Sequence, residues 1–203
     1  MISNSEIEKW YEGKSFTSDW TSLNFPTWAE LLSARRELST SVLEIGSWEG
    51  RSALFFLNYL PKSRIVCIDT FSGGLDHTSK PESAEILPHI EARFDANLAE
   101  FSERVEKIKA ESSIALPQLG ISGRRFDVAL VDGSHEGPDV YSDAVLASSM
   151  LVKSGIMIFD DYEWELAEDP LQRPKVGIDA FLTAFASQYF VLERGYQLIL
   201  EKH

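Results

Sequence analysis

The sequence predicts an α/β protein in which a doubly wound, mostly parallel sheet of seven strands ends in an antiparallel hairpin. Short apolar runs, rich in β-branched or aromatic residues, alternate with longer amphipathic runs, as in a parallel sheet covered by helices. The last two apolar runs are separated by little more than one glycine, which is typical of a hairpin. A length of 203 residues suits one well-buried domain rather than two.

Five apolar runs predict the parallel strands. Four of them are clear, and each ends at a polar residue or a glycine. The third run along the chain is more polar, but it fills the gap between the second and the fourth. The expected strands span Val42–Ile45, Ile65–Ile68, Val105–Lys109, Phe126–Val131 and Ile156–Phe159.

The segments between the strands predict the helices. The first is apolar almost all round and stops at Pro61, whereas the others carry apolar residues at helical spacing. The expected helices span Arg51–Leu60, Glu82–Ser102, Pro138–Leu151 and Lys175–Ser187. The expected hairpin pairs Tyr189–Arg194 with Gln197–Glu201 across Gly195.

Residues 1–40 contain no strand signal but are dense in aromatic residues. We expect them to form helices and turns that act as an N-terminal cap or lid, followed by one compact domain over residues 41–203. Trp20, Trp28 and Trp164 are candidates for lining a ligand pocket, because flat aromatic rings stack on sugars and aryl groups. Burial in the core is the more common role of such residues, and we favour it for Trp28.

Composition narrows the classes of partner. The chain has 32 acidic and 19 basic residues, a formal net charge of -13, which argues against nucleic acid or an anionic membrane as the main partner. The single cysteine, Cys67, rules out an internal disulfide framework and fits a reducing compartment. No apolar run approaches the roughly 18 residues of a membrane span, and the N-terminus lacks a signal-peptide pattern. We therefore expect a cytoplasmic protein.

In a doubly wound sheet, ligands bind at the carboxyl ends of the strands, so the segment after the first strand is informative. Gly46 and Gly50 let the backbone turn tightly, but three residues between them and the following Arg51 do not fit a P-loop. The dinucleotide pattern G-x-G-x-x-G is also absent. Glu44 lies inside an apolar strand, where a carboxylate needs a partner, and a ligand with an ammonium group would supply one.

This combination resembles motif I of the class I S-adenosylmethionine-dependent methyltransferases, in Val42–Gly46 followed by Gly50. The resemblance extends over most of the chain, and it implies a Rossmann-like fold. Two later segments are similar to those of the subgroup that includes macrocin O-methyltransferase. The further matching segments are Ile65–Phe71, Lys109–Ser112, Asp127–His135 and Gly155–Tyr162.

The resemblance implies S-adenosylmethionine as the cofactor and places it on this chain. Asp69, at the end of the second strand, would accept hydrogen bonds from the ribose hydroxyls. The segment around Glu111 would flank the adenine. The implied cofactor-binding residues are Glu44, Gly46, Ser47, Gly50, Ser52, Asp69, Thr70, Glu111, Ser112 and Asp132.

The resemblance also implies a site for Mg²⁺ or another divalent cation. Acidic residues after the fourth and fifth strands bind the cation in this subgroup and in the catechol-type enzymes, which implies Asp132, Asp160 and Asp161 as ligands. The catechol-type enzymes have Asn where this chain has Asp161. His135, three residues beyond Asp132 in the loop that should face the substrate, would take the proton of an acceptor hydroxyl, or would only bond the loop backbone. His135 and Asp132 are the predicted catalytic residues.

The predicted activity is methyl transfer to a hydroxyl of a small molecule or saccharide. Several alternatives stay open: a metal-independent methyltransferase with His135 as base, a non-catalytic S-adenosylmethionine-binding module, and a nicotinamide-dependent dehydrogenase. The strand-ending aspartates would then cap helices or support loops. His77 lies in a polar loop from which it would reach a substrate. A homo-oligomer is also possible, since the aromatic N-terminal segment would close its own site or a neighbour's.

Overall fold

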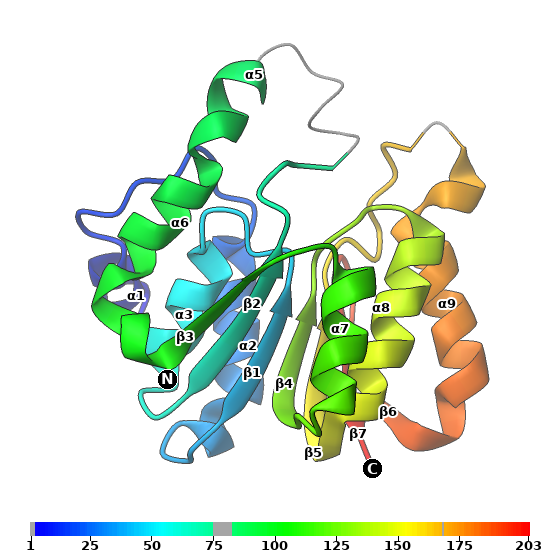
Figure 1. Ribbon diagram of the computed structural model, residues 1–203. Helices are drawn as coiled ribbons and strands as arrows, with labels where there is room; N and C mark the ends of the chain where they lie inside the picture. Colours follow the sequence, from blue (N-terminus) through cyan, green and yellow to red (C-terminus); the bar gives the residue numbers. More distant parts are fainter. Residues whose placement is uncertain (1–2, 75–82, 168) are drawn as a thin grey trace.

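The computed structural model describes residues 3–74, 83–167 and 169–203, and its centre is one seven-stranded sheet (Figure 1). The strands run in the order β3-β2-β1-β4-β5-β7-β6; the first five are mutually parallel, and β7 is antiparallel to both β5 and β6. The strands are β1 (Ser41–Ile45), β2 (Arg64–Asp69), β3 (Val105–Lys109), β4 (Phe126–Val131), β5 (Leu151–Phe159), β6 (Tyr189–Arg194) and β7 (Leu198–Lys202). The predicted fold class is confirmed.

Helices cover both faces of the sheet, so the central strands are buried on both sides. In Figure 1, α1, α2, α3 and α6 lie on one face and α7, α8 and α9 on the other. The described helices are α1 (Asn4–Trp10), α2 (Phe25–Leu31), α3 (Arg51–Tyr59), α5 (Ser83–Ile86), α6 (Ile90–Leu98), α7 (Ser112–Ile121), α8 (Gly137–Met150) and α9 (Pro174–Phe185). Short 3-10 turns complete the secondary structure at Ser22–Asn24, Ser33–Arg35, Leu87–His89, Ala99–Arg104, Pro170–Gln172 and Ala186–Gln188.

Each face has its own apolar core. Trp28, Phe55 and Phe94 are buried between the first group of helices and the sheet. Leu116 and Phe181 belong to the core on the opposite face. The N-terminal helices therefore contribute directly to the first core, with the Trp28 ring stacked on a phenylalanine of α3.

The structure differs from the predicted elements in three places. Helix α7 follows β3 but was not expected, because its residues are apolar almost all round and it contains Pro117. The expected helix Glu82–Ser102 is divided into α5, α6 and two 3-10 turns, since Pro88 cannot continue the hydrogen-bond ladder; Glu82 itself lies outside the described residues. Strand β5 begins at Leu151, so α8 ends at Met150.

Strand order reverses between β1 and β4. The helix after β1 packs on one face and the helix after β4 on the other. In sheets of this kind, ligands bind beyond the carboxyl ends of the strands at such a reversal. Within the described residues, no helix combines the length and the apolar composition that crossing a membrane would require.

Candidate active site

The turn after β1 is shaped by two glycines. Gly46 has a φ of 84°, and a Cβ atom there would overlap the carbonyl oxygen of Asp132. The two strand ends are also tied together, because the backbone N–H of Asp132 donates to the carbonyl of Ile45 at 2.9 Å. Gly50, with a φ of 81°, is the N-cap of α3. Glycine at 46 therefore lets the ends of β1 and β4 meet in direct backbone contact.

Glu44 is fully buried just before this turn. Its Oε1 accepts a hydrogen bond from the hydroxyl of Ser52 at 2.6 Å, whereas no group in the described part of the chain donates to its Oε2. Burial raises the pKa of the Glu44 carboxyl. An unpaired buried carboxylate oxygen is costly, so this position suits a ligand that brings a positive charge or a donor.

Asp69, at the end of β2, holds the glycine turn in place. Its Oδ2 accepts from the backbone N–H groups of Ser47 and Trp48, both at 2.7 Å, and its Oδ1 accepts from the N–H of Phe71 at 2.6 Å. Thr70 beside it is half-buried, and its hydroxyl oxygen accepts from a backbone N–H two residues on. Each carboxylate oxygen of Asp69 can accept more than one hydrogen bond, so these contacts leave capacity for a ligand hydroxyl.

The N-terminal segment supports the same turn from outside. Glu49 is buried within the turn, and its Oε2 accepts from both the backbone N–H and the hydroxyl of Thr17, at 2.6 and 3.0 Å. Its Oε1 is paired with Arg93 of α6 at 2.8 Å. The side chain of Asn97 bonds the backbone of both Ser15 and Glu49. The turn is therefore fixed between the N-terminal segment and α6.

Glu111 and Ser112 begin α7, beyond the end of β3. Glu111 is exposed at the N-cap, whereas Ser112 is half-buried and faces the carboxylate of Asp143 on α8, whose pKa it lowers. Asp143 is buried, and burial raises the pKa of its carboxyl to about 6. The two predicted adenine neighbours thus point in different directions.

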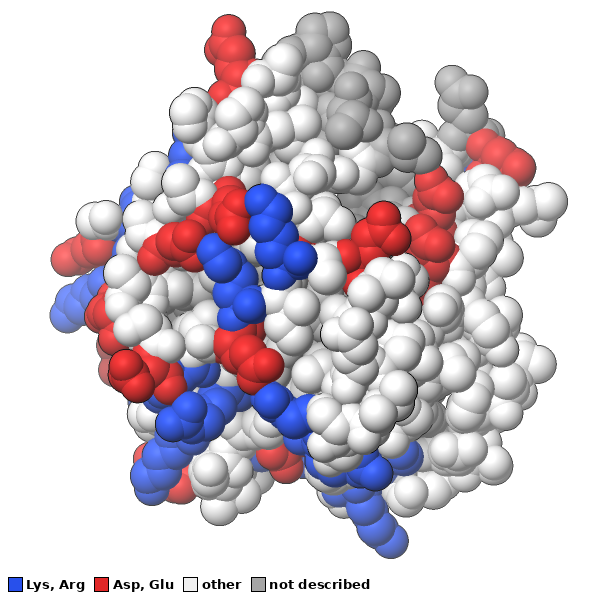
Figure 2. Space-filling model, viewed as in Figure 1, with Lys and Arg blue, Asp and Glu red and all other residues white. Residues whose placement is uncertain are grey.

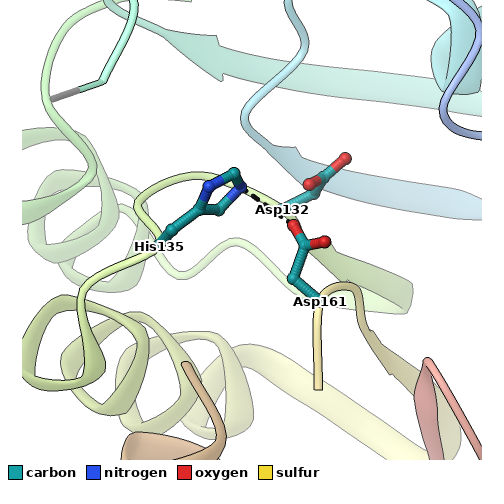
Figure 3. A group of neighbouring side chains, drawn as sticks. All are labelled: Asp132, His135 and Asp161. Atoms are coloured by element: carbon teal, nitrogen blue, oxygen red, sulfur yellow. Dashed lines mark ion pairs between the residues drawn. The ribbon is translucent and has the colours of Figure 1, made fainter. Parts of the chain in front are cut away.

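Three side chains beyond β4 and β5 converge on one point. Ligand atoms of Asp132, His135 and Asp161 all lie within 4.8 Å of one another, and Figure 3 shows the imidazole and the Asp161 carboxylate directed toward each other. The His135 Nε2 lies 2.9 Å from the Asp161 Oδ2. Burial, followed by the charges of Asp160 and Asp161, raises the pKa of the Asp132 carboxyl well above its usual range.

Asp160 does not belong to this group, although it was expected to be a ligand together with Asp132 and Asp161. Its Oδ1 instead accepts a hydrogen bond from the side-chain amide of Gln197 at 2.6 Å. Asp161 itself has a φ of 55°, a left-handed backbone conformation directly after Asp160. Burial and the neighbouring Asp161 raise the pKa of Asp160 to about 6.

Sequence reasoning missed two residues of the site, Tyr196 and Gln197, in the turn between β6 and β7. The Tyr196 hydroxyl donates to the Asp161 Oδ1 at 2.7 Å. The Trp164 ring lies 4.7 Å from the His135 ring, while Trp28 is in the core as favoured. The predicted antiparallel hairpin was the available signal, because it returns the chain to the end of β5. His77 lies outside the described residues.

Acidic side chains also lie on the molecular surface near the candidate site. Figure 2 shows acidic side chains beside the hollow in the upper part of the molecule, where Figure 1 places the carboxyl ends of the central strands. Lys and Arg side chains also gather on this face, some of them level with the hollow and others lower, and many lie beside acidic groups. The mouth of the candidate site is therefore acidic on the side shown, which favours cations over anions.

A family model described as a methyltransferase domain matches residues 43–162, more than half of the chain. The chain therefore belongs to the methyltransferase domain family, and the predicted class, an S-adenosylmethionine-dependent methyltransferase, is confirmed. No curated protein sequence matches the chain.

Solved O-methyltransferase structures share the fold. One from Bacillus cereus, in complex with SAH, is 16% identical with a TM-score of 0.66, over 100% of this chain and 93% of that one. TomG from Streptomyces achromogenes, involved in tomaymycin synthesis and solved with SAM, is 18% identical with a TM-score of 0.64, over 100% and 92%. MycE from mycinamycin biosynthesis, solved with Mg, SAH and mycinamycin VI, is 17% identical with a TM-score of 0.65; the match covers 96% of this chain and 52% of MycE.

Proposed function

We propose that this protein is an O-methyltransferase that transfers the methyl group of S-adenosylmethionine to a hydroxyl of a small molecule or saccharide, with a divalent cation such as Mg²⁺. The observation that carries the proposal is the convergence of Asp132, His135 and Asp161 beside the glycine turn after β1. The structural neighbours solved with SAM or SAH, and MycE with Mg, support it. The resemblance to the macrocin-type subgroup is part of this proposal.

The glycine turn would bind the methionine end of the methyl donor. The unpaired Oε2 of Glu44 would face its ammonium group, with Ser52 holding the other carboxylate oxygen. Gly46 and Gly50 would let the backbone approach the ligand, and Asp69 would accept from the ribose hydroxyls. Ser47, Thr70, Glu111 and Ser112 would complete the pocket, with the last two beside the adenine.

The acidic group would hold the cation. Carboxylate oxygens of Asp132 and Asp161 and a nitrogen of His135 form a mixed oxygen and nitrogen donor set, and Asp160 adds negative charge next to it. A bound divalent cation supplies positive charge that favours the ionised form of an adjacent acceptor hydroxyl. The protein residues would then contribute orientation, aligning that oxygen with the sulfonium methyl.

A metal-independent reaction is the second candidate, and the 2.9 Å approach of the His135 Nε2 to the Asp161 Oδ2 favours it. If the His135 Nε2 donates to Asp161, the Nδ1 is the basic nitrogen of the neutral ring. It would take the proton of the acceptor hydroxyl as the oxygen attacks the methyl group. The products in either case are a methyl ether and S-adenosylhomocysteine.

The two candidates differ in their response to chelation and to substitution of Asp132. SAH formation would be measured with a panel of catechols and glycosides, in Mg²⁺ and in EDTA. We expect turnover that EDTA abolishes and that Asp132→Asn lowers by about 10²-fold or more, since charge stabilisation by a bound cation contributes several kcal/mol. Full turnover in EDTA would leave only the His135 mechanism. Binding of S-adenosylmethionine without turnover of any acceptor would favour a non-catalytic module.

The acceptor class is part of the same proposal. The net charge of -13 supports a small molecule or saccharide rather than nucleic acid or an anionic membrane. Trp164, beside His135, and Tyr196, beside Asp161, present aromatic rings on which a flat acceptor would stack. Cys67, the single cysteine, supports a reducing and therefore cytoplasmic setting.

A further inference from the structure

The turn between β6 and β7 reaches the acidic residues because of the strand register. Strand β7 runs antiparallel to β5, and Leu198 is paired with Phe159. The residues that precede Leu198 therefore lie opposite those that follow Phe159. This register brings Gln197 to Asp160 and Tyr196 to Asp161, with hydrogen bonds of 2.6 and 2.7 Å.

Gln197 has a fixed orientation. Its Oε1 accepts from the indole N–H of Trp28 at 2.8 Å, and both side chains are buried. An indole N–H can only donate, so it requires the amide oxygen on its side and turns the amide nitrogen toward Asp160. The buried chain from Trp28 through Gln197 to Asp160 thus fixes the amide nitrogen of Gln197 as the donor to the Asp160 carboxylate.

Tyr196 acts on the neighbouring aspartate. Its hydroxyl engages the Oδ1 of Asp161, while the Oδ2 of the same carboxylate faces His135 at 2.9 Å. The turn is itself attached to the loop after β5, since the carbonyl of Tyr196 accepts from the backbone N–H of Glu163. Each oxygen of Asp161 therefore has a separate partner, and the carboxylate cannot rotate without breaking a contact.

We propose that Tyr196 and Gln197 are positioning residues for the cation site, each orienting one of the two consecutive aspartates. This inference rests on the proposed function, because it assigns these residues to the outer layer of the cation site. Partners that hydrogen-bond to ligating carboxylates fix their orientation, and their loss commonly lowers metal affinity by about 10–100-fold. Gln197 holds Asp160 beside the group, and Tyr196 leaves the Asp161 Oδ2 directed into it.

The test is calorimetric titration of Mg²⁺ into the full chain without other ligands. We expect Tyr196→Phe, which acts on the proposed ligand Asp161, to weaken Mg²⁺ binding by about 10–100-fold. Gln197→Leu, which acts on the neighbouring Asp160, should weaken it by a smaller factor. SAH affinity should stay within about twofold of wild type. Gln188→Leu and Tyr141→Phe make the same chemical changes on exposed residues and should leave Mg²⁺ affinity unchanged.

Gln197→Leu also leaves the buried N–H of Trp28 without its acceptor, which would destabilise the fold. The double variant Trp28→Phe/Gln197→Leu removes the donor and the acceptor together. It therefore separates a loss of stability from a loss of carboxylate positioning. Unchanged Mg²⁺ affinity in Tyr196→Phe and in this double variant would overturn the inference while leaving the cation site in place. Absence of Mg²⁺ binding in wild type would instead overturn the proposed cation site, and the positioning role with it.

Discussion

Single residues at the ends of the central strands combine burial with negative charge. Glu44, Asp132 and Asp160 are three carboxyl groups whose pKa burial raises, and each lies where a ligand would approach. A charge held in such surroundings destabilises the folded protein unless it is paired. These three carboxyl groups do not favour the folded state by themselves, so a role in ligand binding explains them better than a role in stability.

Asp143 provides a test of the cost of burial away from the reacting groups. Burial raises the pKa of its carboxyl from the ordinary 3.8 to about 6, and the charge of Asp139 adds to the effect. Because the folded pKa is the higher one, the folded state is favoured by protonation, and stability falls as pH rises from about 4 to about 6. The difference between the two pKa values corresponds to about 3 kcal/mol in the free energy of unfolding.

We therefore expect Asp143→Asn to raise the free energy of unfolding at pH 7.5 by about 1–3 kcal/mol and to have little effect near pH 4. Asparagine keeps an oxygen that accepts from Ser112 but cannot ionise. Urea unfolding at several pH values measures this. An equal effect at both pH values would show that the substitution acts through packing instead.

Glu44→Gln tests the proposed contact with the methyl donor. The amide keeps the shape of the side chain and the acceptor for Ser52, but it removes the charge. We expect SAH affinity to fall by about 10–100-fold, which corresponds to the 1.5–3 kcal/mol of a hydrogen bond to a charged group. Stability of the unliganded protein at neutral pH should not fall. Glu8→Gln, on an exposed residue of α1, is the control, and equal SAH affinity in all three proteins would remove Glu44 from the site.

At the scale of elements, the contact between the ends of β1 and β4 depends on Gly46. Gly46→Ala would place a methyl group against the Asp132 carbonyl, at a residue with a positive φ. We therefore expect the free energy of unfolding to fall by about 3 kcal/mol or more, and no measurable SAH binding. Gly123→Ala is a matched control, because its φ is 76° and its Cβ would meet nothing within 4 Å. Gly123→Ala should lower the free energy of unfolding by about 1–2 kcal/mol and preserve SAH binding. Similar losses for both variants in urea unfolding would contradict the close contact.

The elements that could be predicted are those with a distinct pattern. The buried strands are apolar runs, and the C-terminal hairpin has a glycine turn. Helix α7 was not predicted, because its segment is apolar on all sides and contains Pro117, so it shows no amphipathic periodicity. The division of the expected helix Glu82–Ser102 depends on Pro88, whose effect can be expected from the sequence.

The site was predictable in its location but not in its detail. Strand ends could be located from apolar runs, and the structure places Glu44, Asp69 and Asp132 at or beside those ends. The orientation of Asp161 depends on a left-handed backbone conformation, and the approach of Gln197 depends on the register of β7 against β5. Neither is encoded in a short pattern, because both are set by tertiary packing.

At the scale of the whole molecule, two apolar cores hold the sheet between helices, and the carboxyl ends of the parallel strands meet at the same edge of the sheet. The glycine turn, the Asp69 carboxylate and the acidic group all lie at that edge. The N-terminal segment reaches it through Thr17 and Glu49. We therefore expect that binding of the methyl donor involves the sheet and the N-terminal segment around Thr17 together.

Calorimetric titration of SAH into the wild type and Asp69→Asn, in Mg²⁺, tests the central claim most directly. We expect one site in wild type and affinity at least about tenfold lower in the variant, because the amide cannot replace a carboxylate that accepts from the turn and, as proposed, from the ribose. Absence of SAH binding to the wild type, or equal affinity in both proteins, would contradict it.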